Sequence, residues 1–376
     1  SCSNLGTFYE RGTVVERDLP AAAKLYAQAC DGSVLLGCAN LGVFYEEGTV
    51  FPRDYARAFS LYSAACEGGE TLGCNNLGAL YDRGKGVPVN DARAVELYTQ
   101  ACGKDDQLAC ANLALHYSNG TGVVQDKPRA LKMFDAACNA GEPIGCYGLG
   151  KAYSHGDGVT KDKTRAAALY SMACDGGDMV ACSDLGLLHQ NGTGVRQDYA
   201  KALSLYTMAC DARIALGCSN LGTLYADGKG TAKDDARAVK FYRQACDMGE
   251  PLGCSNLGLQ YQYGAGVPKD LAEAVRLQQQ ACDAKEPLGC YNLGVHAENG
   301  LGIPRNYGRA ANLYRQACDM DDSWACFNLA VLYYKGRGVK ADRDQAIALF
   351  RKALVLDPTM DDARKALVAL GAKPQG

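Results

Sequence analysis

Eighteen of the nineteen cysteines in this 376-residue chain form nine pairs, and the two members of each pair lie eight residues apart. The pairs recur every 36 residues, and only Cys2 has no partner in the sequence. Paired thiols can form disulfides, hold a metal ion or serve as small buried side chains. The nine pairs are Cys30/Cys38, Cys66/Cys74, Cys102/Cys110, Cys138/Cys146, Cys174/Cys182, Cys210/Cys218, Cys246/Cys254, Cys282/Cys290 and Cys318/Cys326.

The spacing of these cysteines favours disulfides over a metal site. Structural zinc sites use close pairs such as C-x-x-C or add histidines. The chain has no C-x-x-C, and its four histidines, which we expect to be exposed or to face a groove, lie in different repeats: His116, His155, His189 and His296. We therefore predict no metal and no cofactor. Disulfides indicate an oxidising compartment, and reduced thiols that act as small core residues stay open as the alternative.

The fixed period of 36 residues indicates a stacked array of helical repeats. We count positions from the second cysteine of each pair, or its equivalent, as 0. Every repeat has Leu at +3, Gly or Ala at +4 and Gly at +10, and most have Tyr at +7. This spacing predicts a first helix that stops at the glycine. Ala at +20 and +27 and Tyr or Phe at +24 in nine repeats predict a second helix packed on the first.

We expect an all-α solenoid in which ten helical hairpins form one domain, residues 1–361. The ten repeats begin at Cys2, Cys38, Cys74, Cys110, Cys146, Cys182, Cys218, Cys254, Cys290 and Cys326. Cys2 lies where a second cysteine is due, so we expect its partner to precede the sequence shown.

The last repeat departs from the pattern, since Leu354 and Asp362 stand where a cysteine pair is due. We expect residues 362–376 to form a C-terminal capping helix and tail. Thr359 is the predicted N-cap, and Ala363, Leu367 and Leu370 are predicted to face inward.

The recurring motif is Cys-x-Asn-Leu-Gly-x-x-Tyr, then Gly-x-Gly-Val, a polar connector, Ala, and Tyr before Ala-Cys. It resembles the Sel1-like repeat, and with cysteines eight apart it is most similar to the Helicobacter cysteine-rich protein family. The Leu-Asp-Pro ending of the last repeat resembles a tetratricopeptide repeat. The resemblance implies a right-handed α/α superhelix, disulfide-locked hairpins and export to the periplasm or the cell exterior. Related cysteine-rich Sel1 proteins in the mitochondrial intermembrane space supply an alternative location and an alternative role as an assembly factor.

Some members of that family carry a β-lactamase or penicillin-binding label, so such a hydrolase is a further alternative. A serine acylation site of this kind needs Ser-x-x-Lys, and no serine in the chain has lysine three residues later. We therefore predict no catalytic residue and favour a scaffold that binds a protein or peptide.

A solenoid of this kind usually binds its partner on the concave face, which the first helices line. Asn occurs at +2 in eight of the ten repeats, and the resemblance to tetratricopeptide clamps implies that it contacts peptide. It can instead hold neighbouring helices together. The aromatic residues at +1 and near the helix ends can form a groove or merely pack on adjacent helices. The predicted binding residues are Asn40, Asn76, Asn112, Asn220, Asn256, Asn292, Asn328, Tyr147, Tyr263, Tyr291, Phe327 and Tyr334.

Two repeats lose a core aromatic residue, because Gln278 replaces the Tyr at +24 and Ala297 the Tyr at +7. We expect a cavity or bend near Gln278. Glu46, Glu47 and Asp82 are expected to give the early groove negative charge.

The net charge of −3, with acids and bases interspersed, argues against nucleic acid as a partner. No run approaches the roughly 18 apolar residues of a membrane helix, so we predict no membrane insertion. We expect a monomer.

Overall fold

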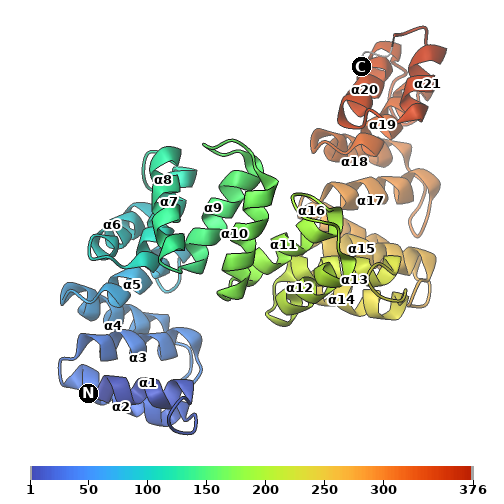
Figure 1. Cartoon of the computed structure of the whole chain (residues 1–376). Coiled ribbons are helices and arrows are strands. Elements are labelled where there is room, and N and C mark those ends of the chain that lie inside the picture. The colour runs from blue at the N-terminus through green and yellow to red at the C-terminus, as the bar shows by residue number, and fades with distance from the viewer. Residues whose placement is uncertain (1, 374–376) are drawn as a thin grey trace. The chain divides into compact units, whose positions relative to one another are not determined.

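The computed structural model describes residues 2–373, which form 21 α-helices and no strand (Figure 1). The first helices of the hairpins are odd-numbered: α1 (Cys2–Arg11), α3 (Leu35–Glu47), α5 (Thr71–Arg83), α7 (Gln107–Asn119), α9 (Pro143–His155), α11 (Met179–Asn191), α13 (Ala215–Asp227), α15 (Pro251–Tyr263), α17 (Pro287–Asn299) and α19 (Ser323–Lys335). The second helices are even-numbered: α2 (Leu19–Asp31), α4 (Tyr55–Glu67), α6 (Asp91–Cys102), α8 (Lys127–Asn139), α10 (Lys163–Asp175), α12 (Tyr199–Asp211), α14 (Asp235–Asp247), α16 (Leu271–Asp283), α18 (Tyr307–Asp319) and α20 (Arg343–Leu356). Hairpin 1 is α1 with α2, and hairpin 10 is α19 with α20. The predicted all-α solenoid of hairpins is confirmed.

Each helix begins and ends at residues that recur with the repeat. Every even-numbered helix is preceded by an Asp or Asn whose side chain accepts a backbone N–H of the first turn, as Asp54 does from Arg57 at 2.9 Å. The glycine at +10 adopts the left-handed conformation that ends the odd-numbered helix, as at Gly48 with φ 74°. The predicted glycine stop is therefore confirmed.

Small residues let neighbouring helices approach closely. The Ala at +20 and the Tyr or Phe at +24 of the even-numbered helices are buried, and Ala58 and Tyr62 are examples. A Cβ added to Gly37 in α3 would lie 2.5 Å from the Cβ of Ala29 in α2, so this approach requires glycine. Burial of these apolar side chains is the main force that holds one hairpin to the next.

Within each unit, the predicted disulfides join an even-numbered helix to the odd-numbered helix that follows, as Cys66–Cys74 joins α4 to α5. Eight bonds have Cα–Cα distances of 4.4–4.7 Å between residues eight apart. Cys174 and Cys182 are also disulfide-bonded, and Cys2 is the free cysteine. The loop-entropy model gives each closed loop of about nine residues roughly 2–3 kcal/mol of stabilisation.

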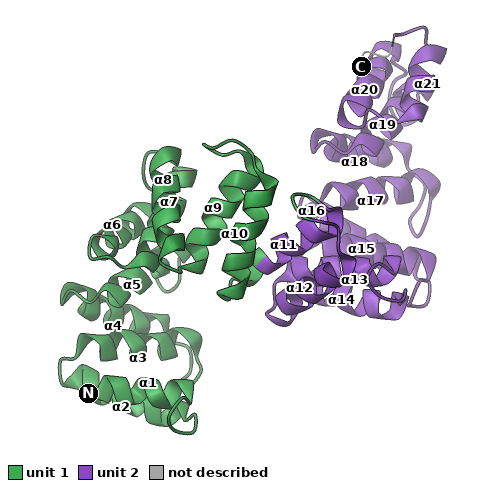
Figure 2. Cartoon of the chain, in the orientation of Figure 1, with its two compact units in different colours: residues 1–181, 193–195 green, residues 182–192, 196–376 purple. Residues whose placement is uncertain are grey.

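The chain forms two compact units (Figure 2). Unit 1 comprises the described residues up to 181 with 193–195, and unit 2 comprises 182–192 with the rest from 196. Within unit 1, α3 lies beside α5 and α7 beside α9; within unit 2, α13 lies beside α15 and α15 beside α17. Neighbouring odd-numbered helices therefore share a surface, as expected for the binding side of a solenoid.

The C-terminal helix α21 (Asp361–Ala369) closes the last hairpin. Ala363, Leu367 and Leu370 are buried, as predicted. The predicted N-cap is wrong, because Met360 holds that position while the backbone N–H and hydroxyl of Thr359 both donate to Asp357. Each helix between residues 2 and 373 is too short or too polar to span a bilayer.

Candidate binding face

We define the odd-helix face as the surface formed by positions +2, +5, +8 and +9 of the odd-numbered helices. In hairpins 2 and 3 this face contains a pocket of about 620 Å³. Its lining residues are Val43, Glu46, Glu47, Arg53, Tyr55, Tyr62, Asn76, Arg83 and Lys85. The predicted negative charge of the early groove is therefore balanced by three cations in the same pocket.

Glu46, Tyr62 and Asn76 form a hydrogen-bonded network in this pocket. The Tyr62 hydroxyl donates to Glu46 Oε2 at 3.0 Å, and the Asn76 amide from the next hairpin bonds the same hydroxyl. Burial, reinforced by the charge of Glu46, raises the pKa of Tyr62 well above its usual value. Lys85 Nζ pairs with the second carboxylate oxygen, Glu46 Oε1, at 3.0 Å.

Unit 2 repeats this network in hairpins 9 and 10. The Tyr314 hydroxyl donates to Glu298 Oε2 at 2.8 Å. The Asn328 side chain hydrogen-bonds both Tyr314 and Tyr291. The same three repeat positions, +8, +24 and +2 of the next hairpin, therefore bring a carboxylate, a tyrosine and an amide together in each unit.

The asparagines predicted to bind a partner all lie on this face, in α3, α5, α7, α13, α15, α17 and α19. Four of them also form side-chain hydrogen bonds to a neighbouring helix. Asn76 and Asn328 bond the tyrosines named above. Asn112 donates to Asn75 Oδ1 at 2.9 Å, and Asn292 donates to Ser255 Oγ at 3.4 Å. The side chains of Asn40, Asn220 and Asn256 are half-buried and form no hydrogen bond within residues 2–373. Binding by these amides stays a prediction.

The predicted aromatic residues occupy two kinds of place. The rings at +1 are half-buried and pack on the +24 ring of their own hairpin: Tyr147 on Tyr170 with centroids 5.7 Å apart, Tyr291 on Tyr314 at 6.0 Å, and Phe327 on Phe350 at 5.4 Å. In contrast, Tyr263 and Tyr334 are 71% and 55% exposed. These two rings, near the ends of α15 and α19, are the ones a partner can reach most freely.

The structure corrects the predicted cavity at Gln278, because the side chain fills that space, and the predicted bend stays a prediction. The side chain is fully buried, its Nε2 donates to the Ser255 backbone oxygen at 2.9 Å, and its Oε1 accepts from Ser255 Oγ at 2.8 Å. A Cβ added to Gly258 would lie 2.7 Å from the amide nitrogen. Hydrogen bonds and close packing thus fill the space that tyrosine occupies elsewhere.

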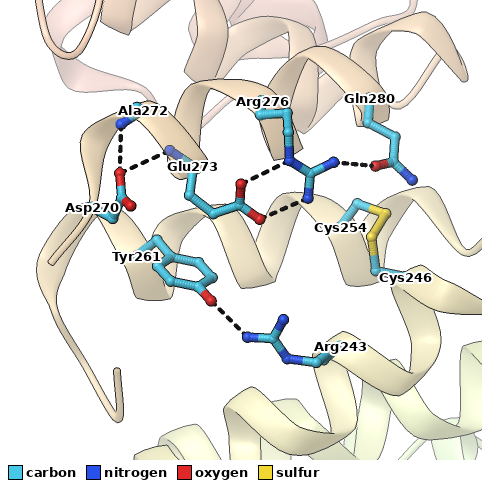
Figure 3. Close-up of polar contacts among 9 residues, drawn as sticks. All are labelled: Arg243, Cys246, Cys254, Tyr261, Asp270, Ala272, Glu273, Arg276 and Gln280. Carbon is cyan, nitrogen blue, oxygen red and sulfur yellow. Dashed lines mark hydrogen bonds and ion pairs between the residues drawn. A yellow bond between two sulfur atoms is a disulfide. The ribbon is translucent and has the colours of Figure 1, made fainter. Parts of the chain in front are cut away.

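The tyrosines at +7 pair with arginines where odd- and even-numbered helices meet. Arg129 lies over Tyr117 at 4.2 Å and Arg165 over Tyr153 at 4.3 Å. In hairpin 8 the equivalent arginine position is Glu273, which bonds Arg276 instead (Figure 3). These pairs were not predicted from the sequence, although Tyr at +7 and Arg at +19 recur together in several repeats.

Three of the four histidines are buried, which corrects the expectation that all four are exposed or face a groove. His116 and His296 take the apolar +6 position, and their Nδ1 atoms contact the backbone oxygens of Thr121 and Leu301 at 2.9 and 2.7 Å. His189 is buried as well, and His155 is exposed. Residues 2–373 contain no group of three or more His, Cys, Asp or Glu side chains placed to hold a metal ion.

The sequence model of the Sel1 repeat matches ten segments of the chain: 1–34, 35–70, 71–106, 107–142, 143–178, 180–213, 215–250, 251–285, 287–322 and 325–354. Among curated proteins, no sequence matches.

Several solved structures are similar. The Escherichia coli protein c5321, described as a protective antigen of uropathogenic strains with an SLR fold, is 28% identical, with a TM-score of 0.66, and the match covers 98% of this chain and 79% of that one. A Sel1 repeat protein from Oxalobacter formigenes is 23% identical, covering 65% and 96%, with a TM-score of 0.59. Helicobacter pylori cysteine rich protein B is 30% identical, covering 35% and 93%, with a TM-score of 0.29.

Proposed function

Because this chain belongs to the Sel1 repeat family, we propose that it is an exported, disulfide-linked scaffold that binds a protein or peptide partner on its odd-helix face without catalysing a reaction. The observation that carries the proposal is the odd-helix face itself. It combines a pocket of about 620 Å³ with a row of half-buried asparagines.

The chemistry of this face suits an extended peptide. An asparagine side chain both donates and accepts hydrogen bonds, so Asn40 in unit 1, and separately Asn220 and Asn256 in unit 2, can pair with a peptide backbone without reading its side chains. Several +5 positions carry aliphatic residues, such as Leu115 in unit 1 and Leu259 in unit 2, which offer apolar contact.

Display selection of random peptides on the intact protein tests this proposal. The double variant L115R/L259R has one substitution in each unit. It should weaken binding of the selected peptides about tenfold or more, because it places charge on the odd-helix face. The matched control is Arg at Met172 and Met208, which are exposed apolar residues of the even-numbered helices α10 and α12. Failure to select any peptide, or equal loss with both variants, would overturn the proposal.

Export is supported by the disulfides, because such bonds persist in oxidising compartments. The description of c5321 as a protective antigen is consistent with a location outside the cytoplasm. We propose the periplasm or the cell exterior, and the mitochondrial intermembrane space remains the alternative.

Thiol alkylation of the protein taken directly from the cells that make it tests export. The sample is denatured without reductant and alkylated, and its mass is measured by mass spectrometry to count the alkylated thiols. We expect alkylation of Cys2 alone, whereas labelling of most of the nineteen cysteines would contradict export. A reduced sample labelled at all cysteines is the control.

A further inference from the structure

A second pocket, of about 690 Å³, lies beside α14 in unit 2 and includes no residue of the odd-helix face. We call it the cationic pocket, because three cations and one carboxylate line it. These charged residues are Arg213, Lys240, Arg243 and Asp247. The excess of positive charge gives the pocket a preference for an anion.

Arg213 has a backbone conformation that is unfavourable for arginine. It lies at −5, in the connection between α12 and α13, and its φ is 64°. A positive φ occurs at −5 in all nine connections of this kind, and four of them have glycine there. Because the left-handed region disfavours most residues that have a Cβ, arginine strains the backbone where glycine would not. Strain of this kind indicates that the side chain serves a function.

The equivalent position in hairpin 10 shows where a side chain at −5 points. Asp321 Oδ1 lies 3.4 Å from Lys352 Nζ of α20. Lys352 occupies +26, the position of Gln244 in the cationic pocket. The space between this connection and the following even-numbered helix therefore accommodates a carboxylate beside a cation.

Hairpin 7 has a cation at −5 instead of that carboxylate. In the part of the chain that the structure describes, neither Arg213 nor Lys240 forms an ion pair or a side-chain hydrogen bond. Arg243 bonds the Tyr261 hydroxyl through Nη2 alone, so its other N–H groups can still donate. No other repeat has cations at −5, +22 and +25 together. An anion from outside the chain would relieve the repulsion among these three charges.

We propose that the cationic pocket binds an aspartate or glutamate side chain of a protein partner. The inference goes beyond the proposed function, because it adds a binding surface on the even-numbered helices and a partner of defined charge. A guanidinium group holds a carboxylate through two parallel N–H donors, and Arg213 and Arg243 each supply one such group. Val239 and Met248 also line the pocket and offer apolar contact to the rest of the bound segment.

Three rhodamine-labelled octapeptides that alternate valine with glutamate, glutamine or lysine test the inference by fluorescence anisotropy on the intact, disulfide-bonded chain. We expect the glutamate peptide to bind about tenfold more tightly than the glutamine peptide at low salt, and the lysine peptide to bind most weakly. Equal binding of the glutamate and glutamine peptides, or no binding of either, would overturn the inference.

The key variant is R213G, which removes the charge and introduces the residue that suits a positive φ. It should weaken the glutamate peptide about fivefold, leave the glutamine peptide unchanged and be at least as stable as the wild type in denaturant. The matched control is K285G, which removes the same charge at −5 of hairpin 9, where Asn312 replaces the +22 lysine. It should change binding of the glutamate peptide by less than about twofold.

Equal losses in R213G and K285G would overturn the inference, because they would show attraction to overall charge alone. A less stable R213G would overturn it as well, since the arginine would then serve the fold itself. Phosphatidylglycerol vesicles are the second probe. Vesicle binding that R213G abolishes, without binding of the glutamate peptide, would assign the pocket to a lipid headgroup and overturn the choice of a protein partner.

Discussion

Arg243 Nη2 donates a hydrogen bond to the Tyr261 hydroxyl at 2.6 Å, and the two residues belong to neighbouring hairpins (Figure 3). In four hairpins the arginine at +19 lies over the +7 tyrosine of its own hairpin, as Arg237 does over Tyr225 at 5.4 Å. Hairpin 8 has Glu273 there, and the preceding hairpin supplies the cation instead. Arg315 replaces the missing partner of Tyr333 in the same way, at 2.8 Å.

This relationship predicts energetic coupling between hairpins 7 and 8. A double-mutant cycle of R243A and Y261F should give a coupling free energy of about 0.5–1 kcal/mol by denaturant unfolding. The cycle of R237A and Y225F is the control within one hairpin. Additive effects of R243A and Y261F would show that the contact contributes nothing to stability.

The ring at +24 and the residue at +4 should be coupled as well. A Cβ added to Gly42 would lie 2.6 Å from Tyr62 Cε1, so G42A should destabilise the fold by about 1–3 kcal/mol. The only repeats with Ala at +4 have Phe at +24, namely Ala114 with Phe134 and Ala330 with Phe350. A phenylalanine ring at +24 can shift because it lacks the hydroxyl group by which Tyr62 is held to Glu46.

Y62F should therefore recover part of the stability lost in G42A, measured by thermal and denaturant unfolding. On its own, Y62F should cost about 0.5–1.5 kcal/mol through the lost hydrogen bond. A double variant as unstable as the sum of the two single changes would contradict this coupling.

Gln278 provides a third prediction, because its amide makes two buried hydrogen bonds with Ser255. Q278L should destabilise the protein by about 1–3 kcal/mol, since it leaves the Ser255 hydroxyl without this partner. Q278Y removes the same two hydrogen bonds but buries a ring beside Gly258, as the +24 tyrosines do in other repeats, so we expect it to be less destabilising than Q278L. A Q278L variant as stable as the wild type in denaturant would be inconsistent with this account.

The sequence was enough to predict the hairpins, their glycine stops, the disulfide partners and the buried side of the last helix, because each depends on residues that recur every 36 positions. The Asp and Asn caps recur just as regularly and were recognisable, as was the pairing of Ala114 with Phe134. The hydrogen bonds of Asn76 and Gln278 could not be recognised from the sequence, because the partner of a polar side chain depends on how neighbouring hairpins pack. The burial of His296 escaped prediction for the same reason.

Alkaline pH should destabilise the fold through its buried tyrosines. Burial and the hydrogen bond to Glu10 raise the pKa of Tyr26 to about 12, against about 10 for an unfolded tyrosine. The folded state therefore holds this proton more tightly. The resulting stability is fully present below about pH 10 and is lost as pH rises toward 12.

Denaturant unfolding between pH 8 and 12, with tyrosinate absorbance followed in parallel, measures this effect. The comparison of wild type with Y26F isolates the contribution of Tyr26. Ionisation of Tyr26 near pH 10, the ordinary value for a tyrosine, would argue against the raised pKa.

Hydrogen–deuterium exchange of the intact, disulfide-bonded chain, with and without a peptide obtained by display selection, tests the proposed binding face most directly. We predict slower exchange on peptide binding in odd-numbered helices and in the glycine turns that end them, for example α15, α17 and Gly264. Slower exchange confined to even-numbered helices such as α12 and α14 would contradict binding on the odd-helix face.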